Sequence, residues 1–132
     1  MVLVDTSVWI RALSNREPYA REMDTLLDRD AVVGHEFVFG ELLIGDRGGR
    51  NKFLAAYEQI EWAATIPHAE VAAFVRGRHL HGRGVGWIDV HLLASAVAGG
   101  LRLWTADPRF AIVATELGIA YELHYGGSGR NG

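Results

Sequence analysis

Short apolar runs alternate along the chain with longer segments that have the periodicity of amphipathic helices. The apolar runs predict strands over 2–4, 31–33, 64–66, 101–104 and 119–121. The segments between them predict helices over 8–13, 18–29, 35–45, 51–61, 68–80, 86–98 and 108–117. This alternation favours an α/β fold, a three-layer sandwich in which helices cover both faces of a mostly parallel sheet of about four to five short strands.

Length and composition are those of a single-domain globular protein. The 132 residues are 49% hydrophobic and 22% charged, which excludes an extended or disordered chain. We expect one domain over 1–125 and a flexible Gly-rich tail over 126–132. The absence of cysteine excludes disulfides, thiolate zinc sites and cysteine nucleophiles. Without a signal-peptide pattern or an apolar run of ~20 residues, we expect a cytoplasmic protein with no membrane partner.

Two acidic residues follow predicted strands. Asp5 comes directly after the first strand, and Asp107 comes three residues after the strand that ends at Trp104. The carboxyl ends of parallel strands meet at one edge of the sheet, where α/β proteins bind ligands. Each residue also suits a simpler role, because Asp5 can cap the first helix and Asp107 precedes Pro108 at a helix start. Taken alone, each is more often a helix cap than a ligand.

Two further acidic residues lie within predicted helices. Glu41 has the helical spacing of Phe37 and Ile44, so we expect it on an apolar stripe rather than on a solvated face. Asp89 lies in a helix that is apolar nearly all round. A buried carboxylate is costly unless a cation or several hydrogen-bond donors compensate its charge. A salt bridge to one of the many arginines satisfies either residue as well as a bound metal ion does.

The four carboxylates are more informative as a set. If Asp5, Glu41, Asp89 and Asp107 converge in one crevice, they repel one another unless a divalent cation screens them. Oxygen ligands favour hard ions such as Mg²⁺ or Mn²⁺ over zinc. The formal net charge of −3 becomes +1 without these four acids, so the rest of the chain is nearly neutral.

Four segments, in this order and spacing, carry a resemblance to a known family. They are Val2-Leu3-Val4-Asp5-Thr6-Ser7-Val8-Trp9-Ile10, Glu41 in its helix, Ile88-Asp89-Val90-His91-Leu92-Leu93-Ala94-Ser95-Ala96, and Thr105-Ala106-Asp107-Pro108-Arg109-Phe110. Over roughly residues 1–123, the sequence resembles the PIN-domain ribonucleases, and specifically the VapC toxins of bacterial toxin–antitoxin pairs. The resemblance implies a PIN-like sandwich. It also assigns Asp5, Glu41, Asp89 and Asp107 to the acidic quartet that holds catalytic Mg²⁺ or Mn²⁺, with Asp107 bound either directly or through water.

The resemblance implies a metal-dependent endoribonuclease that hydrolyses RNA phosphodiester bonds and acts as a toxin. It further implies two partners, a cognate VapB-type antitoxin and a second copy of the chain in a homodimer. Two alternatives stay open: a structure-specific DNA nuclease, because the same metal site cleaves either polymer, and a non-catalytic PIN-like binding module. A phospho-receiver is disfavoured, because Asp5 has no acidic neighbour and the single lysine, Lys52, is misplaced.

Other side chains are candidates for supporting roles. Thr6, Ser7 and Thr105 can donate hydrogen bonds to the carboxylates, although helix capping and turns suit them equally well. Candidates for binding RNA phosphates flank a glycine-rich loop or begin the last helix: Arg47, Arg50, Arg83 and Arg109.

Aromatic and apolar residues have two interpretations each. Trp87, close to Asp89, is a candidate for stacking on an unpaired base, although a core position is the more usual outcome. None of the six histidines has zinc-ligand spacing, and we expect them at the surface or behind the site. The first two helices carry apolar residues that suit ordinary packing or, by the resemblance, an antitoxin groove: Trp9, Ile10, Leu13, Met23, Leu26 and Leu27.

Overall fold

A computed structural model describes residues 1–123, which form seven helices and a three-stranded sheet. The elements in chain order are β1 (Val2–Val4), α1 (Thr6–Leu13), α2 (Tyr19–Asp28), β2 (Val32–Val33), α3 (Glu36–Ile44), α4 (Asn51–Tyr57), α5 (His68–Gly77), α6 (Trp87–Gly99), β3 (Arg102–Trp104) and α7 (Pro108–Glu116). The tail expected over 126–132 lies outside the described residues. Within the described range, no helix has the length and apolar character needed to cross a membrane.

The sheet is parallel throughout, with β1 in the centre and the strand order β2-β1-β3. Leu3 of β1 pairs with Val33 on one side and with Leu103 on the other. The ladder continues past β1, because the N–H of Asp5 donates to the carbonyl of Trp104 at 2.9 Å. The chain therefore leaves the central strand at Asp5, in the middle of the carboxyl edge of the sheet.

The prediction of four to five strands is wrong for the described residues, which contain three. Of the two missing strands, the one expected over 64–66 is replaced by a single parallel bridge between Gly34 and Trp62, and the one expected over 119–121 by a bridge between Leu103 and Ala120. Each bridge has one pair of backbone hydrogen bonds of 2.8 Å, and the chain then turns away. The two segments thus flank the sheet where edge strands were expected, but they pair too briefly to form strands.

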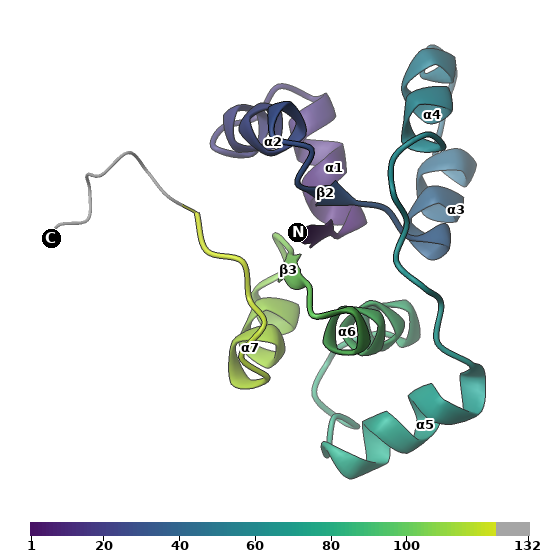
Figure 1. The fold of residues 1–132 in the computed structure, drawn as a ribbon, viewed down its shortest axis with the longest axis vertical. Helices are drawn as coiled ribbons and strands as arrows, with labels where there is room; N and C mark the ends of the chain where they lie inside the picture. Colours follow the sequence, from purple (N-terminus) through teal and green to yellow (C-terminus); the bar gives the residue numbers. More distant parts are fainter. Residues whose placement is uncertain (124–132) are drawn as a thin grey trace, which may run out of the picture.

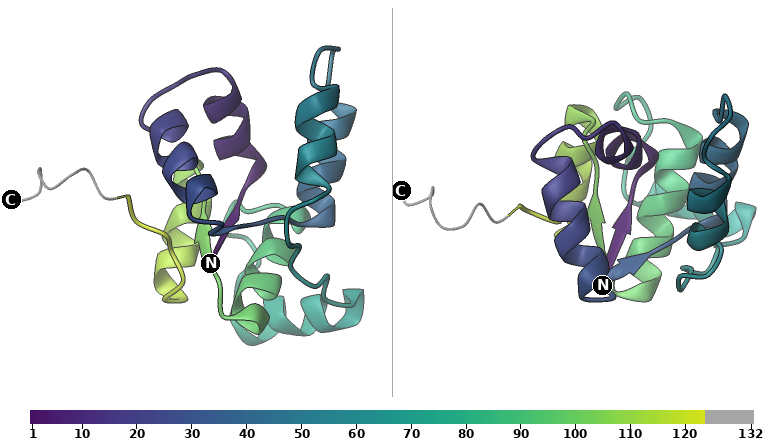
Figure 2. Two further views of the ribbon diagram at one scale, coloured as in Figure 1. Left: turned by 45° about the horizontal axis from the view of Figure 1, so that its top comes forward. Right: turned by 90° about the horizontal axis from the view of Figure 1, so that it is seen from above.

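Helices cover the sheet on both sides, as predicted. Figure 1 shows α1 and α2 above the strands, α5 to α7 below them, and α3 and α4 to the right, beyond β2; Figure 2 shows the three strands side by side. Fully buried side chains come from the sheet (Leu3, Leu103) and from helices of both layers (Val38 of α3, Leu92 of α6, Phe110 of α7). Burying apolar surface on both faces explains why the strands are continuous apolar runs rather than alternating ones.

Three helices begin beside the carboxyl edge of the sheet. Helix α1 starts at Thr6, immediately after β1, and α7 starts at Pro108, shortly after β3. Helix α6 precedes β3 and runs back along it, so its first residue, Trp87, also lies at this edge. Helix N-termini carry partial positive charge, which favours carboxylates nearby.

Candidate active site

Asp5 is the N-cap residue of α1, but its carboxylate is held by two hydroxyl groups and does not cap the helix. It is buried, with 6% of its surface exposed, and its Oδ2 accepts hydrogen bonds from Ser7 Oγ at 2.6 Å and from Thr105 Oγ1 at 2.8 Å. Its side chain makes no cap hydrogen bond to α1. The same hydroxyls accept the backbone N–H groups of Ala106 (3.0 Å) and Asp107 (3.1 Å). These bonds tie the end of β1 to the end of β3.

Glu41 lies on α3 and points toward the start of α1. Its Oε1 accepts a hydrogen bond of 2.6 Å from Thr6 Oγ1. The side chain is half-buried, but the expected apolar stripe around it is not a buried face throughout, because Ile44 is 88% exposed. Contact with Thr6, more than apolar surroundings, positions this carboxylate.

Asp89 is the third residue of α6, where its carboxylate folds back on the helix start. Its Oδ2 accepts the N–H of Gly86 at 2.9 Å. Burial is the main cause that raises the pKa of the Asp89 carboxyl, and the Gly86 hydrogen bond acts against it. The negative charges of Asp5, Asp107 and Glu41 raise this pKa further. Asp89 is therefore within electrostatic reach of the three other acids.

Asp107 caps α7, as its position before Pro108 predicts. Its Oδ1 accepts the N–H groups of Arg109 (2.9 Å) and Phe110 (3.4 Å), and the side chain is exposed. Capping does not remove it from the cluster, because its charge is among those that act on Asp89.

The four carboxylates share two features that suit a cation. In the described part of the chain, every hydrogen bond to one of them goes to a single oxygen, which leaves the second oxygen of each as an acceptor. No salt bridge within residues 1–123 involves them, since the one ion pair found there joins Arg83 to Glu116. The salt-bridge alternative for Glu41 and Asp89 is thus wrong for these residues. An oxygen-only donor set without a protein counter-charge fits a hard divalent ion.

The cluster is not a closed cage. Among the described residues, no group of three or more Asp, Glu or His side chains is arranged closely enough to form a metal site as it stands. Helix caps and hydroxyl groups hold each carboxylate separately, and mutual repulsion opposes closer approach. The arrangement is a set of acids converging on one sheet edge, whose charges interact.

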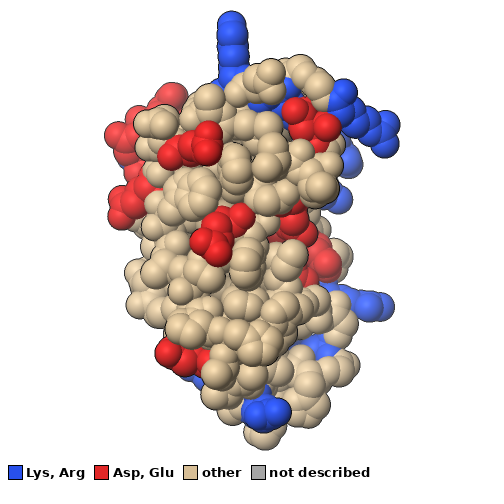
Figure 3. All heavy atoms as spheres, turned by 90° about the vertical axis from the view of Figure 1, so that its right-hand side faces the viewer, with Lys and Arg blue, Asp and Glu red and all other residues tan. Residues whose placement is uncertain are grey.

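The candidate RNA-binding arginines differ in their surroundings. Arg83 forms two hydrogen bonds to Glu116, of 2.9 and 2.8 Å, and is therefore engaged within the protein. Arg109 passes over the loop before α6, because a Cβ placed on Gly84 would lie 2.8 Å from its Cδ. Arg47 and Arg50 lie in the connection between α3 and α4. Basic side chains project at that end of the molecule, above scattered acidic groups (Figure 3).

Three expectations about other side chains change with the structure. Trp87 is 44% exposed and therefore not a core residue. Of the six histidines expected at the surface or behind the site, His35 and His91 are buried. Of the apolar residues on α1 and α2, Trp9, Met23 and Leu26 belong to the core, which leaves Ile10 and Leu27 as the exposed ones.

Sequence reasoning missed the role of His35. Its Nδ1 accepts the N–H of Phe37 at 3.0 Å, which caps α3, so the neutral ring carries its hydrogen on Nε2 and donates to Ser95 Oγ at 3.0 Å. Ser95 in turn donates to the carbonyl of Ala64 at 2.8 Å, and Tyr57 Oη accepts the N–H of His35 at 2.9 Å. The network joins the start of α3 to α6, the two helices that carry Glu41 and Asp89. The one sequence signal was a histidine directly before a helix.

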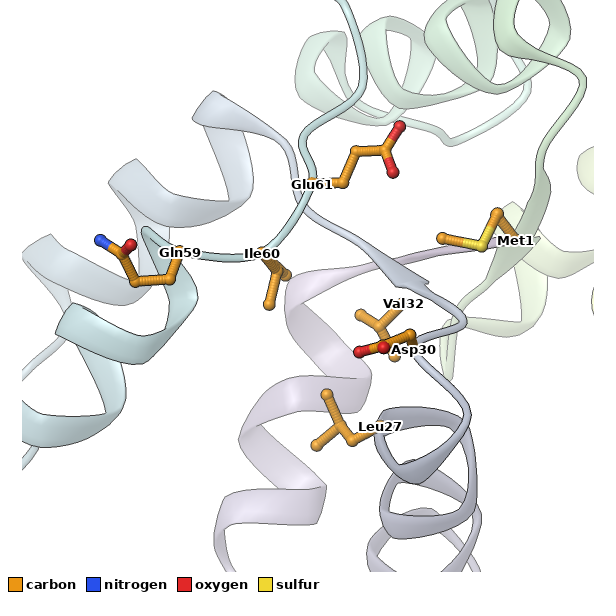
Figure 4. A pocket seen from close by; sticks show the side chains of 7 residues that line it. All are labelled: Met1, Leu27, Asp30, Val32, Gln59, Ile60 and Glu61. Atoms are coloured by element: carbon orange, nitrogen blue, oxygen red, sulfur yellow. The ribbon is translucent and has the colours of Figure 1, made fainter.

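A separate cavity of about 330 Å³ lies at the amino ends of β1 and β2, at the opposite edge of the sheet from the carboxylates (Figure 4). Its lining residues are Met1, Leu27, Asp30, Val32, Gln59, Ile60 and Glu61. Figure 4 shows the carboxylates of Asp30 and Glu61 apart and not directed toward each other. This cavity therefore has no convergent acidic group like that at the carboxyl edge.

The parallel sandwich with acids at its carboxyl edge defines a class, and comparison with known proteins identifies it. The chain belongs to the PIN domain family, which matches residues 2–116. Its sequence is 40% identical over 121 residues to ribonuclease VapC32 of Mycobacterium tuberculosis, in both strain CDC 1551 / Oshkosh and strain ATCC 25618 / H37Rv. That alignment covers 91% of this chain and 95% of the relative.

Two solved structures share the fold. FitAcB from Neisseria gonorrhoeae superposes with a TM-score of 0.59 at 24% identity, over 87% of this chain and 94% of that one. PAE2754 from Pyrobaculum aerophilum superposes with a TM-score of 0.54 at 16% identity, over 89% of this chain and 94% of that one. The resemblance drawn from the sequence motifs, and the PIN-like fold that it implied, are confirmed.

Proposed function

We propose that this chain is a metal-dependent endoribonuclease that acts as the toxin of a toxin–antitoxin pair. The observation that carries the proposal is the set of four carboxylates at one sheet edge, each with an oxygen left for a ligand and none in a salt bridge within the described residues. Similarity along 91% of the chain to a protein named ribonuclease VapC32 supports RNA as the substrate.

Asp5, Glu41 and Asp89 would hold Mg²⁺ or Mn²⁺, and Asp107 would complete the site directly or through water. When bound, such an ion lowers the pKa of a water molecule and stabilises charge on a phosphoryl oxygen. Thr6, Ser7 and Thr105 orient the carboxylates through the hydrogen bonds described above, and partners of this kind strengthen metal binding by fixing the ligands. Asp107 also anchors the start of α7, so one residue serves both the fold and the site.

Arginine side chains near the carboxyl edge of the sheet would bind the substrate. Arg109 follows Asp107 by two residues and lies over the loop that leads into α6. Arg47 and Arg50 provide positive charge beyond the end of α3. Such contacts position the phosphates of a nucleic acid without reading its sequence. Arg83 contributes less, because Glu116 neutralises it.

An antitoxin partner would cover apolar side chains on α1 and α3, which contact each other. Ile10 of α1 is 46% exposed, and Leu43 and Ile44 at the end of α3 are 53% and 88% exposed. Exposed apolar groups in neighbouring helices are typical of interaction surfaces. We place a VapB-type antitoxin there and, as a further proposal, a homodimer that acts on RNA in the cytoplasm.

The test is nuclease activity of the full chain against tRNA, rRNA and mRNA, with single- and double-stranded DNA alongside. We expect RNA cleavage with Mg²⁺ or Mn²⁺, none in EDTA, and a loss of at least about 100-fold in Asp5→Asn, because a lost ligand costs more than the 10- to 100-fold typical of a lost ligand-orienting residue. The matched control Asp24→Asn changes an exposed acid of α2 and should retain activity. Cleavage that persists in EDTA refutes the metal mechanism. Cleavage of DNA alone favours the DNA nuclease.

A further inference from the structure

Trp87 places a large aromatic surface in solvent at the start of α6, the helix that carries Asp89. It is the first residue of α6 and is 44% exposed, whereas Trp9 and Trp104 are 3% and 1% exposed. Asp89 follows two residues later in the same first turn of α6, and its side chain leaves the helix in a different direction. Trp87 keeps far more of its surface in solvent than Trp9 and Trp104 do.

Two imidazole rings hold the indole in place. The ring centroid of His68 lies 5.1 Å from that of Trp87, and the ring of His91 meets it edge-on at 4.9 Å. His91 is itself 4% exposed and packs edge-on against Phe37 at 4.7 Å. The buried side of Trp87 is thus fixed from α5 and α6, while its other surface stays open. A rigid aromatic surface loses little conformational entropy when a flat ligand stacks on it.

The same packing connects the indole to the cluster. Phe37 lies one helical turn before Glu41 on α3, so the contacts run from Trp87 through His91 and Phe37 toward the face that carries Glu41. The loop that leads into Trp87 also lies beneath Arg109, because Gly84 leaves no room for a Cβ there. One short segment therefore brings an aromatic surface and a cation to the edge that carries the acids.

We infer that Trp87 is a stacking platform for an unpaired base of the RNA strand, next to the phosphate placed at the carboxylates. This inference rests on the proposed function and adds the part of the substrate that the indole recognises. A single-stranded nucleic acid needs cations for its backbone and aromatic faces for its bases, and this edge offers both. Trp87 is a substrate-positioning residue, and it selects an unpaired nucleotide over one stacked in a duplex.

The test combines a protein variant with a modified substrate. Initial rates of the full chain with Mg²⁺ are measured on a single-stranded RNA oligonucleotide that it cleaves, and on a series that carries one abasic nucleotide at successive positions. We expect Trp87→Ala to raise KM about 5-fold to 150-fold, the equivalent of 1–3 kcal/mol per stacked base, with kcat little changed. Trp87→Tyr should stay close to the wild type. Leu27 is 40% exposed at the opposite edge of the sheet, and Leu27→Ala should leave KM unchanged.

The abasic series identifies the contact. In the wild type, one abasic position should raise KM by about the factor that Trp87→Ala does, and in Trp87→Ala the same position should have no further effect, since coupled partners do not add. Additive effects at every position overturn the inference and leave the nuclease proposal intact. A change of oligomeric state in Trp87→Ala, measured by light scattering with an unaltered abasic profile, assigns the indole to a protein contact and overturns it too. A wild type that neither binds nor cleaves RNA with Mg²⁺ or Mn²⁺ refutes both proposals.

Discussion

The buried imidazole of His35 predicts an acid-sensitive fold. Burial lowers the pKa of His35 from 6.5 to about 4; the nearby charge of Glu36 acts against this, and His91 adds to it. A protonated ring would also lose its acceptor for the N–H of Phe37. Below its ordinary pKa, the unfolded chain binds a proton at His35 that the folded chain does not, so stability falls as the pH drops from about 6.5 to about 4.

The size of the effect follows from the two pKa values. Since one pKa unit is worth about 1.4 kcal/mol, the full loss amounts to roughly 3 kcal/mol, of which about 2 kcal/mol has been lost at pH 5. His91, whose pKa burial also lowers, adds to the loss in the same direction. The total is a sizeable part of the 5–15 kcal/mol that stabilises a typical domain.

The assay is urea unfolding in EDTA at pH 7 and pH 5, for the wild type and for His35→Asn. Asparagine keeps an oxygen that accepts the N–H of Phe37, but it does not titrate. We expect the variant to be less stable at pH 7 by about 1–3 kcal/mol, from the lost bond to Ser95 and the smaller side chain. Between pH 7 and pH 5, the free energy of unfolding of His35→Asn should fall by about 2 kcal/mol less than that of the wild type. The exposed His79→Asn serves as the control, and equal pH dependence in wild type and His35→Asn refutes the reasoning.

Three further predictions concern the acidic edge. Asp89→Asn should raise the midpoint of thermal unfolding in EDTA, because it removes a partly buried carboxylate that three other acids repel. The same variant should lose RNA cleavage. An unchanged or lower unfolding midpoint contradicts the prediction. Thr105→Val removes a donor to Asp5, so calorimetric titration should show Mn²⁺ affinity reduced about 10- to 100-fold, and full affinity would argue against a ligand role for Asp5. Gly84→Ala adds a Cβ at a residue with φ +83° and pushes it against Arg109, so urea unfolding should show about 1–2 kcal/mol lower stability. The displaced Arg109 should also raise the KM for RNA, and an unchanged KM would show that Arg109 does not bind RNA.

Some features of this fold could be predicted because their cause is local in sequence. The cap of α7 depends on Asp107 and the next three residues, and it forms as predicted. Asp5 is the same residue type at the start of α1, yet its side chain does not cap that helix, and its carboxylate instead accepts hydrogen bonds from Ser7 and from Thr105, 100 residues away. The residue type is the same in the two cases, and the pairing of β1 with β3 is what brings Thr105 to Asp5.

The edge strands show the same limit. The apolar runs near 64 and 119 lie close to the sheet, but each pairs at one position only. A strand forms where a neighbour of matching length lies alongside it, which is information about the whole sheet rather than about the run itself. The exposure of Trp87 also depends on remote parts of the chain. Trp87 lies in a strongly apolar helix, but how much of it is exposed depends on where that helix begins relative to α5.

By itself, the sequence determined the order of the seven helices and of the three strands that form, the layered α/β class and the four acids as a set of candidate ligands, because periodicity, capping and residue chemistry act over a few neighbouring positions. Only the tertiary structure decided that the charges of Asp5, Glu41 and Asp107 act on Asp89 with no salt bridge to these acids in the described residues, that His35 is buried, and that Trp87 is half-exposed. Those outcomes depend on segments remote in the chain, since burial and charge are properties of what surrounds a side chain in space.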